Sequence, residues 1–299
     1  MESSSAPAII EAALNGGRSR AEHAALPVTP GEIADEARRC ADAGASVVHI
    51  HAQDEAGTAR TDLDWYTATI RAIRAAAPGL LISLTTIRPE GTPVATVNDL
   101  LTALAANAAT RPDLASVNLG HLVAWERSDV PGGRRTIHYP NSHDDLAATL
   151  GKCAADGIAP ELGLMDIGFI ANAVALRHDG LLPALPWFLL ELDSPAFGSG
   201  WQVAPSTIAN YDFLAHLLRE HFPAAPWAAH GHGVPGYAVI ERALATGAHA
   251  RVGFEDCLQL PDGNLAPSNA SQVEWAVATA RALGREPATL EEARVIIGL

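Results

Sequence analysis

The chain has almost no lysine. Of its 20 basic residues, all are arginine except Lys152. Lys152 falls in the amphipathic stretch 144–152, where a solvated surface charge is the simplest interpretation. Schiff-base catalysis needs a lysine that is desolvated or lies beside another cation. Schiff-base chemistry, including that of pyridoxal phosphate, is therefore nearly excluded, and a carbonyl substrate would have to be polarised by a metal or by arginine.

The chain also has few cysteines, a negative net charge and no long apolar run. The three cysteines are widely spaced, which fits neither a zinc finger nor a disulfide framework. The net charge of −14 argues against nucleic acid or an anionic membrane as a partner. No run would span a bilayer, and the first residues lack the basic and apolar regions of a signal peptide. We therefore expect a cytoplasmic, enzyme-sized globular protein that acts on small molecules.

Short apolar runs alternate with helical stretches along the 299 residues. Thr29, Pro30 and Glu32 form a capping box that opens a helix ending near Gly44, and a second helix is expected at 62–76. Strands are expected at 8–14, 46–50, 80–85, 114–119, 162–167, 185–192, 226–230 and 249–254. Eight strands with helices between them predict an α/β fold, a (β/α)8 TIM barrel in a single domain, 1–299. The competitor is a doubly wound open sheet, but no G-x-G-x-x-G motif follows the first strand.

Two histidines one residue apart, His49 and His51, end the apolar strand that starts at Ser46. Because side chains alternate along a strand, both imidazoles lie on the same face. Two imidazoles side by side in a dry place are costly unless they share a divalent metal. The alternative is one histidine satisfied in the core and one that merely caps the strand. We favour the metal, which requires a third ligand.

The third ligand should come from another strand end, because barrel enzymes gather their chemistry there. The eighth strand reads Arg251-Val252-Gly253-Phe254-Glu255-Asp256, and in a closed barrel it lies near the second. Glu255 can therefore join His49 and His51, while Asp256 leaves the strand on the opposite side. Two histidines and a carboxylate leave coordination positions open for substrate, as in catalytic zinc sites. For Arg251 and Asp256 the alternative is a structural ion pair.

These residues resemble the β-keto acid cleavage enzymes, a family that includes 3-keto-5-aminohexanoate cleavage enzyme. The resemblance runs nearly the whole length, and its specific part is His-x-His combined with Arg-x-Gly-Phe-Glu-Asp at 251–256. It is also carried by the segments 26–30, 84–86, 112–118, 158–161 and 268–270. The resemblance implies a TIM barrel, one zinc per chain, a homo-oligomer (dimer or tetramer) and acetyl-CoA as co-substrate. The implied reaction converts a β-keto acid and acetyl-CoA into acetoacetate and a new acyl-CoA.

The resemblance also implies roles for single residues. It places zinc on His49, His51 and Glu255, and it makes Asp256 the general base with Arg251 as its assistant. Hydrogen-bonding roles toward substrate and intermediates fall to Thr85 and Ser116, where the family more often has serine and threonine respectively. Both exchanges keep the hydroxyl group. Thr86 and Asn118, at the ends of the same two strands, are further candidates for substrate binding.

Departures from the family pattern concern the tail of the keto acid. Where the relative that acts on an amino-substituted substrate has two glutamates facing the ammonium group, this chain has Arg18 and Gly163. An arginine there disfavours a cationic tail, because like charges repel strongly in a dry pocket. We therefore expect a neutral or anionic tail, with Arg18 either binding it or gripping a coenzyme A phosphate.

Three further residues have no assigned role at this point. Gln53 stands where relatives often have arginine, and His230 and His232 could contact either substrate or coenzyme. Two other functions stay open. One is a metal-dependent barrel aldolase or hydrolase that acts on a keto acid, and the other is a non-catalytic barrel that binds a keto acid or an acyl-CoA.

Overall fold

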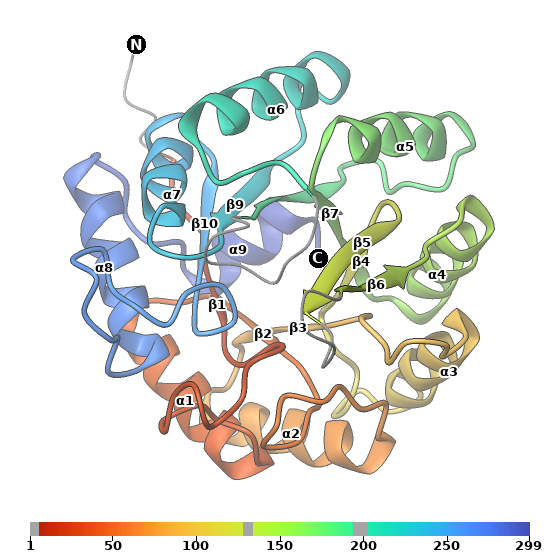
Figure 1. Ribbon diagram of the computed structural model, residues 1–299, viewed down its shortest axis with the longest axis horizontal. Coiled ribbons are helices and arrows are strands. Elements are labelled where there is room, and N and C mark those ends of the chain that lie inside the picture. Colours follow the sequence, from red (N-terminus) through yellow and green to blue (C-terminus); the bar gives the residue numbers. More distant parts are fainter. Residues whose placement is uncertain (1–5, 128–133, 194–202) are drawn as a thin grey trace.

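A closed barrel of parallel strands forms the centre of the protein. The computed structural model describes residues 6–127, 134–193 and 203–299. The barrel strands follow one another in the order β1-β10-β9-β8-β7-β4-β3-β2, and helices surround them (Figure 1). They are β1 (Ile10–Ala13), β2 (Val47–Ile50), β3 (Leu81–Leu84), β4 (Leu114–Asn118), β7 (Ala159–Leu164), β8 (Trp187–Leu192), β9 (Trp227–Gly231) and β10 (His249–Val252). The predicted TIM barrel is confirmed.

Nine helices are present in the described ranges, and several of them begin at a side-chain cap. They are α1 (Pro30–Ala43), α2 (Leu63–Ala76), α3 (Val94–Ala105), α4 (His143–Asp156), α5 (Ile167–His178), α6 (Ile208–His221), α7 (Gly236–Ala245), α8 (Asn269–Ala282) and α9 (Leu290–Ile297). The capping box predicted at Thr29 and Glu32 is present, and Gly44 ends α1 with a φ of 111°. Within the described ranges, none of these helices has the length and apolar character needed to cross a bilayer.

Among the strand boundaries that differ from the sequence-based prediction, two bear on the site. β7 covers Ala159–Leu164 rather than 162–167. The chain has left the sheet by Asp166, whose carboxylate caps α5 by accepting from the Gly168 and Phe169 amides. β10 ends at Val252 rather than at residue 254. There Gly253 has a φ of 148° and its Cα packs so closely against the Ala13 carbonyl that a side chain would overlap it. This glycine turns the chain toward residues 255 and 256.

One element was not predicted at all. An antiparallel hairpin, β5 (Leu122–Arg127) and β6 (Arg134–Tyr139), follows β4 and forms a small sheet of its own. It stands beside the β4 label in Figure 1. Leu122, Ile137 and Tyr139 line the same cavity as His51 and Glu255, so the hairpin covers the carboxyl ends of the strands.

The barrel interior is apolar at one end and polar in the middle. An apolar cluster fills the end where the strands begin, and α9, behind the barrel in Figure 1, packs against it through Ala293 and Ile297. One step further along the strands, the buried side chains are polar or charged: Glu11, His49, Ser83, Glu161, His230 and Arg251. The barrel is therefore packed, and its ionisable groups lie directly beneath the cavity at its carboxyl end.

Candidate metal centre and active site

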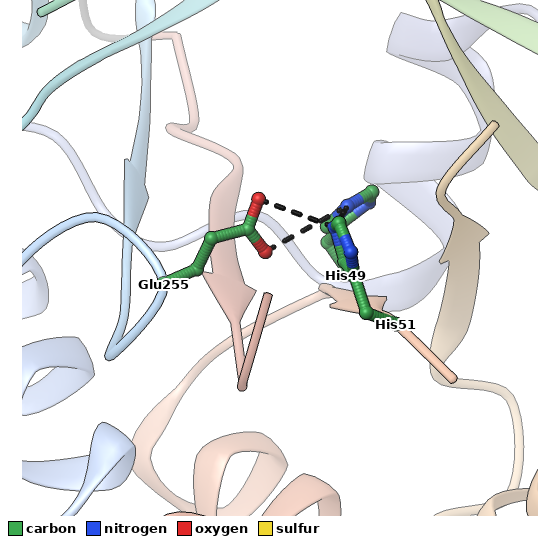
Figure 2. Close-up of side chains that lie close together, drawn as sticks. All are labelled: His49, His51 and Glu255. Atoms are coloured by element: carbon green, nitrogen blue, oxygen red, sulfur yellow. Dashed lines mark hydrogen bonds and ion pairs between the residues drawn. The ribbon is translucent and has the colours of Figure 1, made fainter. Parts of the chain in front are cut away.

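Three ligand atoms converge at the carboxyl end of β2. His49 is the third residue of that strand and His51 follows it. Their Nε2 atoms are 3.0 Å apart, and the Glu255 carboxylate lies 3.8 Å from His49 Nε2 and 3.3 Å from His51 Nε2 (Figure 2). Glu255 Oε2 is buried and has no hydrogen-bond partner among the described residues. This donor set fits a divalent cation, which would satisfy all three groups at once.

The hydrogen bonds around Ser83 fix the tautomer of His49. The hydroxyl of Ser83 donates to Glu161 Oε2 at 2.9 Å, and His49 Nδ1 lies 3.1 Å from Ser83 Oγ. A hydroxyl has only one proton, so His49 must donate its Nδ1–H to Ser83. Its Nε2 then carries a free lone pair, directed at His51 and Glu255. This is the usual arrangement of a histidine that binds metal.

Electrostatics keep these ligands in the protonation states that metals require. Burial lowers the pKa of His49 to about 3, so its imidazole is neutral. Burial opposes the ionisation of Glu255, but Arg251 and the two imidazoles outweigh it and hold the pKa of the carboxyl well below its usual range. The site therefore offers the neutral imidazole of His49 and the carboxylate of Glu255 near neutral pH.

Arg251 holds both carboxylates of the turn after β10. Its Nη2 donates to Glu255 at 2.7 Å, and its Nε and Nη2 each reach one oxygen of Asp256 at 3.1 Å. The prediction that Glu255 and Asp256 leave the strand on opposite sides is wrong, because the chain has already turned at Gly253. Burial opposes the ionisation of Asp256, but Arg251 and His230 together lower its pKa. Asp256 is thus an ionised carboxylate beside the ligand set.

Beneath the ligands, two glutamates share the barrel interior. Glu11 on β1 and Glu161 on β7 are both fully buried. Burial, together with the charge of Glu161, raises the pKa of Glu11 well above its usual range. Burial opposes ionisation of Glu161 too, but its hydrogen bonds and the nearby His49 and Arg251 outweigh that and lower its pKa. Glu11 is therefore protonated and Glu161 ionised, which places one negative charge under His49.

A cavity of about 410 Å³ opens above this site. His51, Glu255 and Arg251 line it, and so do the predicted substrate-binding residues Arg18 and Asn118. Arg18 donates through Nε to the carbonyls of Phe254 and Glu255 at 3.3 and 3.2 Å, and through Nη1 to Glu22 at 3.4 Å. His232 and Glu191 also belong to the polar part of the lining. The cavity is large enough for a small keto acid beside the ligand set.

Three other predicted residues lie near the cavity but not among its lining. Thr85 accepts from the Ile87 amide at 3.0 Å, and Thr86 donates to the Ser116 carbonyl at 2.6 Å. Both hydroxyl groups thus hold the chain after β3, and Ser116 itself points into the barrel one step below Asn118. Roles of Thr85, Thr86 and Ser116 toward substrate stay predictions.

Gln53 has a definite structural task. Its amide nitrogen donates to the carbonyls of Asn15 and Arg18 at 2.8 and 2.9 Å, and its oxygen accepts from the Gly17 amide at 3.0 Å. It holds the loop after β1 against the candidate metal ligands. In that loop, a side chain on Gly16 would overlap Glu255 and His51, so only glycine fits there.

Sequence reasoning missed Ser83, Glu161 and Glu191. Ser83 and Glu161 point into the barrel two residues before positions already singled out, Thr85 and Gly163, so strand alternation would have found them once β7 is taken to begin at Ala159. Glu191 lies on the predicted strand β8, where no residue had been singled out. Their chemistry depends on the neighbouring strands, which only the closed barrel brings together.

Comparisons with known proteins show which proteins the chain is similar to. The chain is 28% identical over 294 residues to the 3-oxoadipate:acetyl-CoA acetyltransferase of Cupriavidus necator, covering 98% of this chain and 95% of that protein. It is 30% identical over 292 residues to the 3-keto-5-aminohexanoate cleavage enzyme of Fusobacterium nucleatum, with 97% of each chain covered. Among solved structures, ObcA in a binary complex with oxaloacetate superposes with a TM-score of 0.72 at 22% identity, over 92% of this chain and 67% of that one. That likeness shows the barrel fold.

The family model for beta-keto acid cleavage enzymes matches residues 7–299. This range contains the His-x-His pair, the Arg251–Asp256 turn and every strand of the barrel. The chain belongs to the β-keto acid cleavage enzyme family.

Proposed function

We propose that this protein is a zinc-dependent enzyme that converts a β-keto acid and acetyl-CoA into acetoacetate and a new acyl-CoA. The observation that carries the proposal is the convergence of His49, His51 and Glu255 beside the Arg251–Asp256 pair, with His51, Glu255 and Arg251 lining one cavity. Family membership supports the cleavage of β-keto acids, and the names of the relatives support acetyl-CoA as the co-substrate.

The residues divide the work as follows. Zinc held by His49, His51 and Glu255 would supply a Lewis acid that stabilises negative charge developing on the keto oxygen. Asp256 takes the proton from the carbon between the two carbonyl groups, and Arg251 holds both of its oxygens so that it stays ionised and oriented. The carbanion carbon then attacks the thioester carbonyl of acetyl-CoA and releases the coenzyme A thiolate. The thiolate attacks the original keto carbon, and the bond between this carbon and the former carbanion carbon breaks. The products are the new acyl-CoA and acetoacetate.

The tail of the keto acid is neutral or anionic in this proposal. Arg18 lines the cavity, and so does Arg88. The Arg88 guanidinium donates to neutral oxygens of Tyr139, Asn141 and Pro140 and has no carboxylate partner among the described residues. Two permanent cations in one cavity oppose an ammonium group. The variant Arg18→Glu tests this assignment. If it lowers kcat/KM equally for keto acids with every kind of tail, Arg18 binds coenzyme A rather than the tail.

The test is a panel of β-keto acids incubated with acetyl-CoA and zinc-loaded protein, with acetoacetate as the product measured. Acetoacetate formation that depends on acetyl-CoA and disappears in Glu255→Gln supports the proposal. Turnover without acetyl-CoA would indicate an aldolase or hydrolase. Binding of keto acid or acyl-CoA without any turnover would indicate a non-catalytic barrel. The single domain, the homo-oligomer and the cytoplasmic location stay predictions.

A further inference from the structure

The carboxylate of Glu191 occupies the space above Gly163. Gly163 lies on β7 and Glu191 near the end of the neighbouring strand, β8. A side chain at position 163 would overlap Glu191 Oε1 and Asn118 Oδ1, so the glycine is what allows Glu191 to lie across the barrel. Glu191 and Asn118 both line the cavity. The cavity therefore has a carboxylate at this place although residue 163 supplies none.

One oxygen of Glu191 is already engaged within the protein. Its Oε2 lies 3.4 Å from Nε2 of His230, which is fully buried on β9. The other ring nitrogen of His230 lies 3.3 Å from Asp256, and Asp256 is held by Arg251. Glu191, His230, Asp256 and Arg251 thus form one series of polar contacts from β8 to β10. What remains for a ligand is the second oxygen of Glu191, a hydrogen-bond acceptor.

That acceptor site is Glu191 Oε1. In the described part of the chain, no group donates to this oxygen, and the side-chain amide of Asn118 beside it makes no hydrogen bond either. A ligand that brings a donor here completes a charge-assisted hydrogen bond. An ammonium group would bring a donor too, but its charge would meet Arg18 and Arg88 in the same cavity with Glu191 already paired.

We propose that Glu191 and Asn118 form the subsite for the tail of the keto acid, and that this tail carries an uncharged hydrogen-bond donor, a hydroxyl group. The inference rests on the proposed function, because it assumes that the cavity binds a keto acid. It narrows the neutral or anionic tail to one chemical class. It also explains why β7 has a glycine at position 163: the acceptor comes from β8 instead.

The experiment compares four keto acids that differ only at carbon 5: 5-hydroxy-3-oxohexanoate, 3,5-dioxohexanoate, 5-amino-3-oxohexanoate and 3-oxohexanoate. With zinc-loaded enzyme and acetyl-CoA, we expect kcat/KM for the hydroxy acid to exceed each of the others by about 10–100-fold, as a polar site built for a donor discriminates. The comparison with 3,5-dioxohexanoate is the most informative, because its keto group at carbon 5 has nearly the size of the hydroxyl group but only accepts hydrogen bonds. Equal kcat/KM values, or a preference for the ammonium or the oxo tail, would overturn the inference.

Two variants of Glu191 distinguish the effect of its hydrogen-bond acceptor from the effect of its negative charge. Glu191→Met removes the acceptor, so the hydroxy acid should fall to the level of 3-oxohexanoate while 3-oxohexanoate itself changes only a few-fold. Glu191→Gln keeps an acceptor oxygen and should retain more of the preference. Glu90→Gln removes another carboxylate that lines the cavity and serves as the matched control, because it should leave the order of the four substrates unchanged. An unchanged preference in Glu191→Met would contradict the subsite.

Binding measurements keep this test independent of turnover. Titration calorimetry of the four keto acids into zinc-loaded protein without acetyl-CoA reports the same order of preference. If no keto acid yields acetoacetate, the proposed function fails. The calorimetric order, measured in wild type and Glu191→Met, then still decides whether Glu191 reads the tail.

Discussion

Replacing Ser83 by alanine should weaken zinc binding, although Ser83 is not a ligand. Its hydroxyl accepts from His49 Nδ1 at 3.1 Å and donates to Glu161 at 2.9 Å. Without this hydroxyl, the proton of His49 is free to move from Nδ1 to Nε2. In that tautomer Nε2 has no free lone pair, so it cannot bind the metal. Loss of a group that orients a ligating histidine costs about 10–100-fold in metal affinity, which corresponds to about 1.4–2.7 kcal/mol.

The assay is the zinc Kd, measured by competition with a chromophoric chelator at a temperature where all variants are folded. Ser46→Ala is the matched control. Ser46 is also a buried serine, 1% exposed, but its hydroxyl has no hydrogen-bond partner among the described residues. Its removal should leave the zinc Kd unchanged. A Kd for Ser83→Ala within twofold of wild type would refute the tautomer argument.

Three further predictions follow from the same structure. His49→Ala and Glu255→Gln should each lose bound zinc in elemental analysis of protein purified without chelators, because two remaining ligands hold zinc poorly; unchanged metal content would contradict the ligand set. Asp256→Asn should lower turnover by about 10²–10⁴-fold with zinc content intact, and activity within a few-fold of wild type would make this carboxylate structural. Burial and Arg285 lower the pKa of His249 from 6.5 to about 3. Between these two pKa values the unfolded chain binds more protons at this histidine than the folded chain does. The free energy of unfolding therefore falls as pH falls through this range, by up to about 1.4 kcal/mol per pH unit. His249→Asn keeps an acceptor for the Ile9 amide, and urea unfolding between pH 4 and 7 should show a shallower slope; an identical slope would refute the assignment.

The barrel could be predicted because each strand carries its own local signal. The run before His49 is apolar and β-branched, and the capping box at Thr29 marks a helix start that the structure shows at Pro30. The β5–β6 hairpin escaped because its strands pack over the barrel mouth rather than inside it, so they lack a long apolar run. The early end of β10 escaped because it depends on the contact of Gly253 with Ala13, which is distant in sequence.

For the candidate site, the residues were easier to predict than their partners. His49, His51 and Glu255 do converge, because strand alternation and barrel closure suffice to bring them together. The hydroxyl of Ser83 and the charges of Glu11 and Glu161 could not be assigned, since each depends on which side chains face it across the barrel. The prediction of the tail's charge rests on positions 18 and 163 alone. It leaves out Glu191, which only the pairing of β7 with β8 brings beside position 163.

The order of the strands separates two halves of the site. The metal ligands come from β2 and the turn after β10, which flank β1, whereas Asn118, Gly163 and Glu191 come from β4, β7 and β8 on the other arc of the barrel. The β5–β6 hairpin belongs to this second arc and adds its own side chains to the cavity. In the proposed function, substitutions on the second arc change which substrate is accepted while the ligands and the base on the first arc stay in place; Arg18, after β1, is the tail-facing residue outside this arc. New specificities can then arise by exchange of a few residues between β4 and β8.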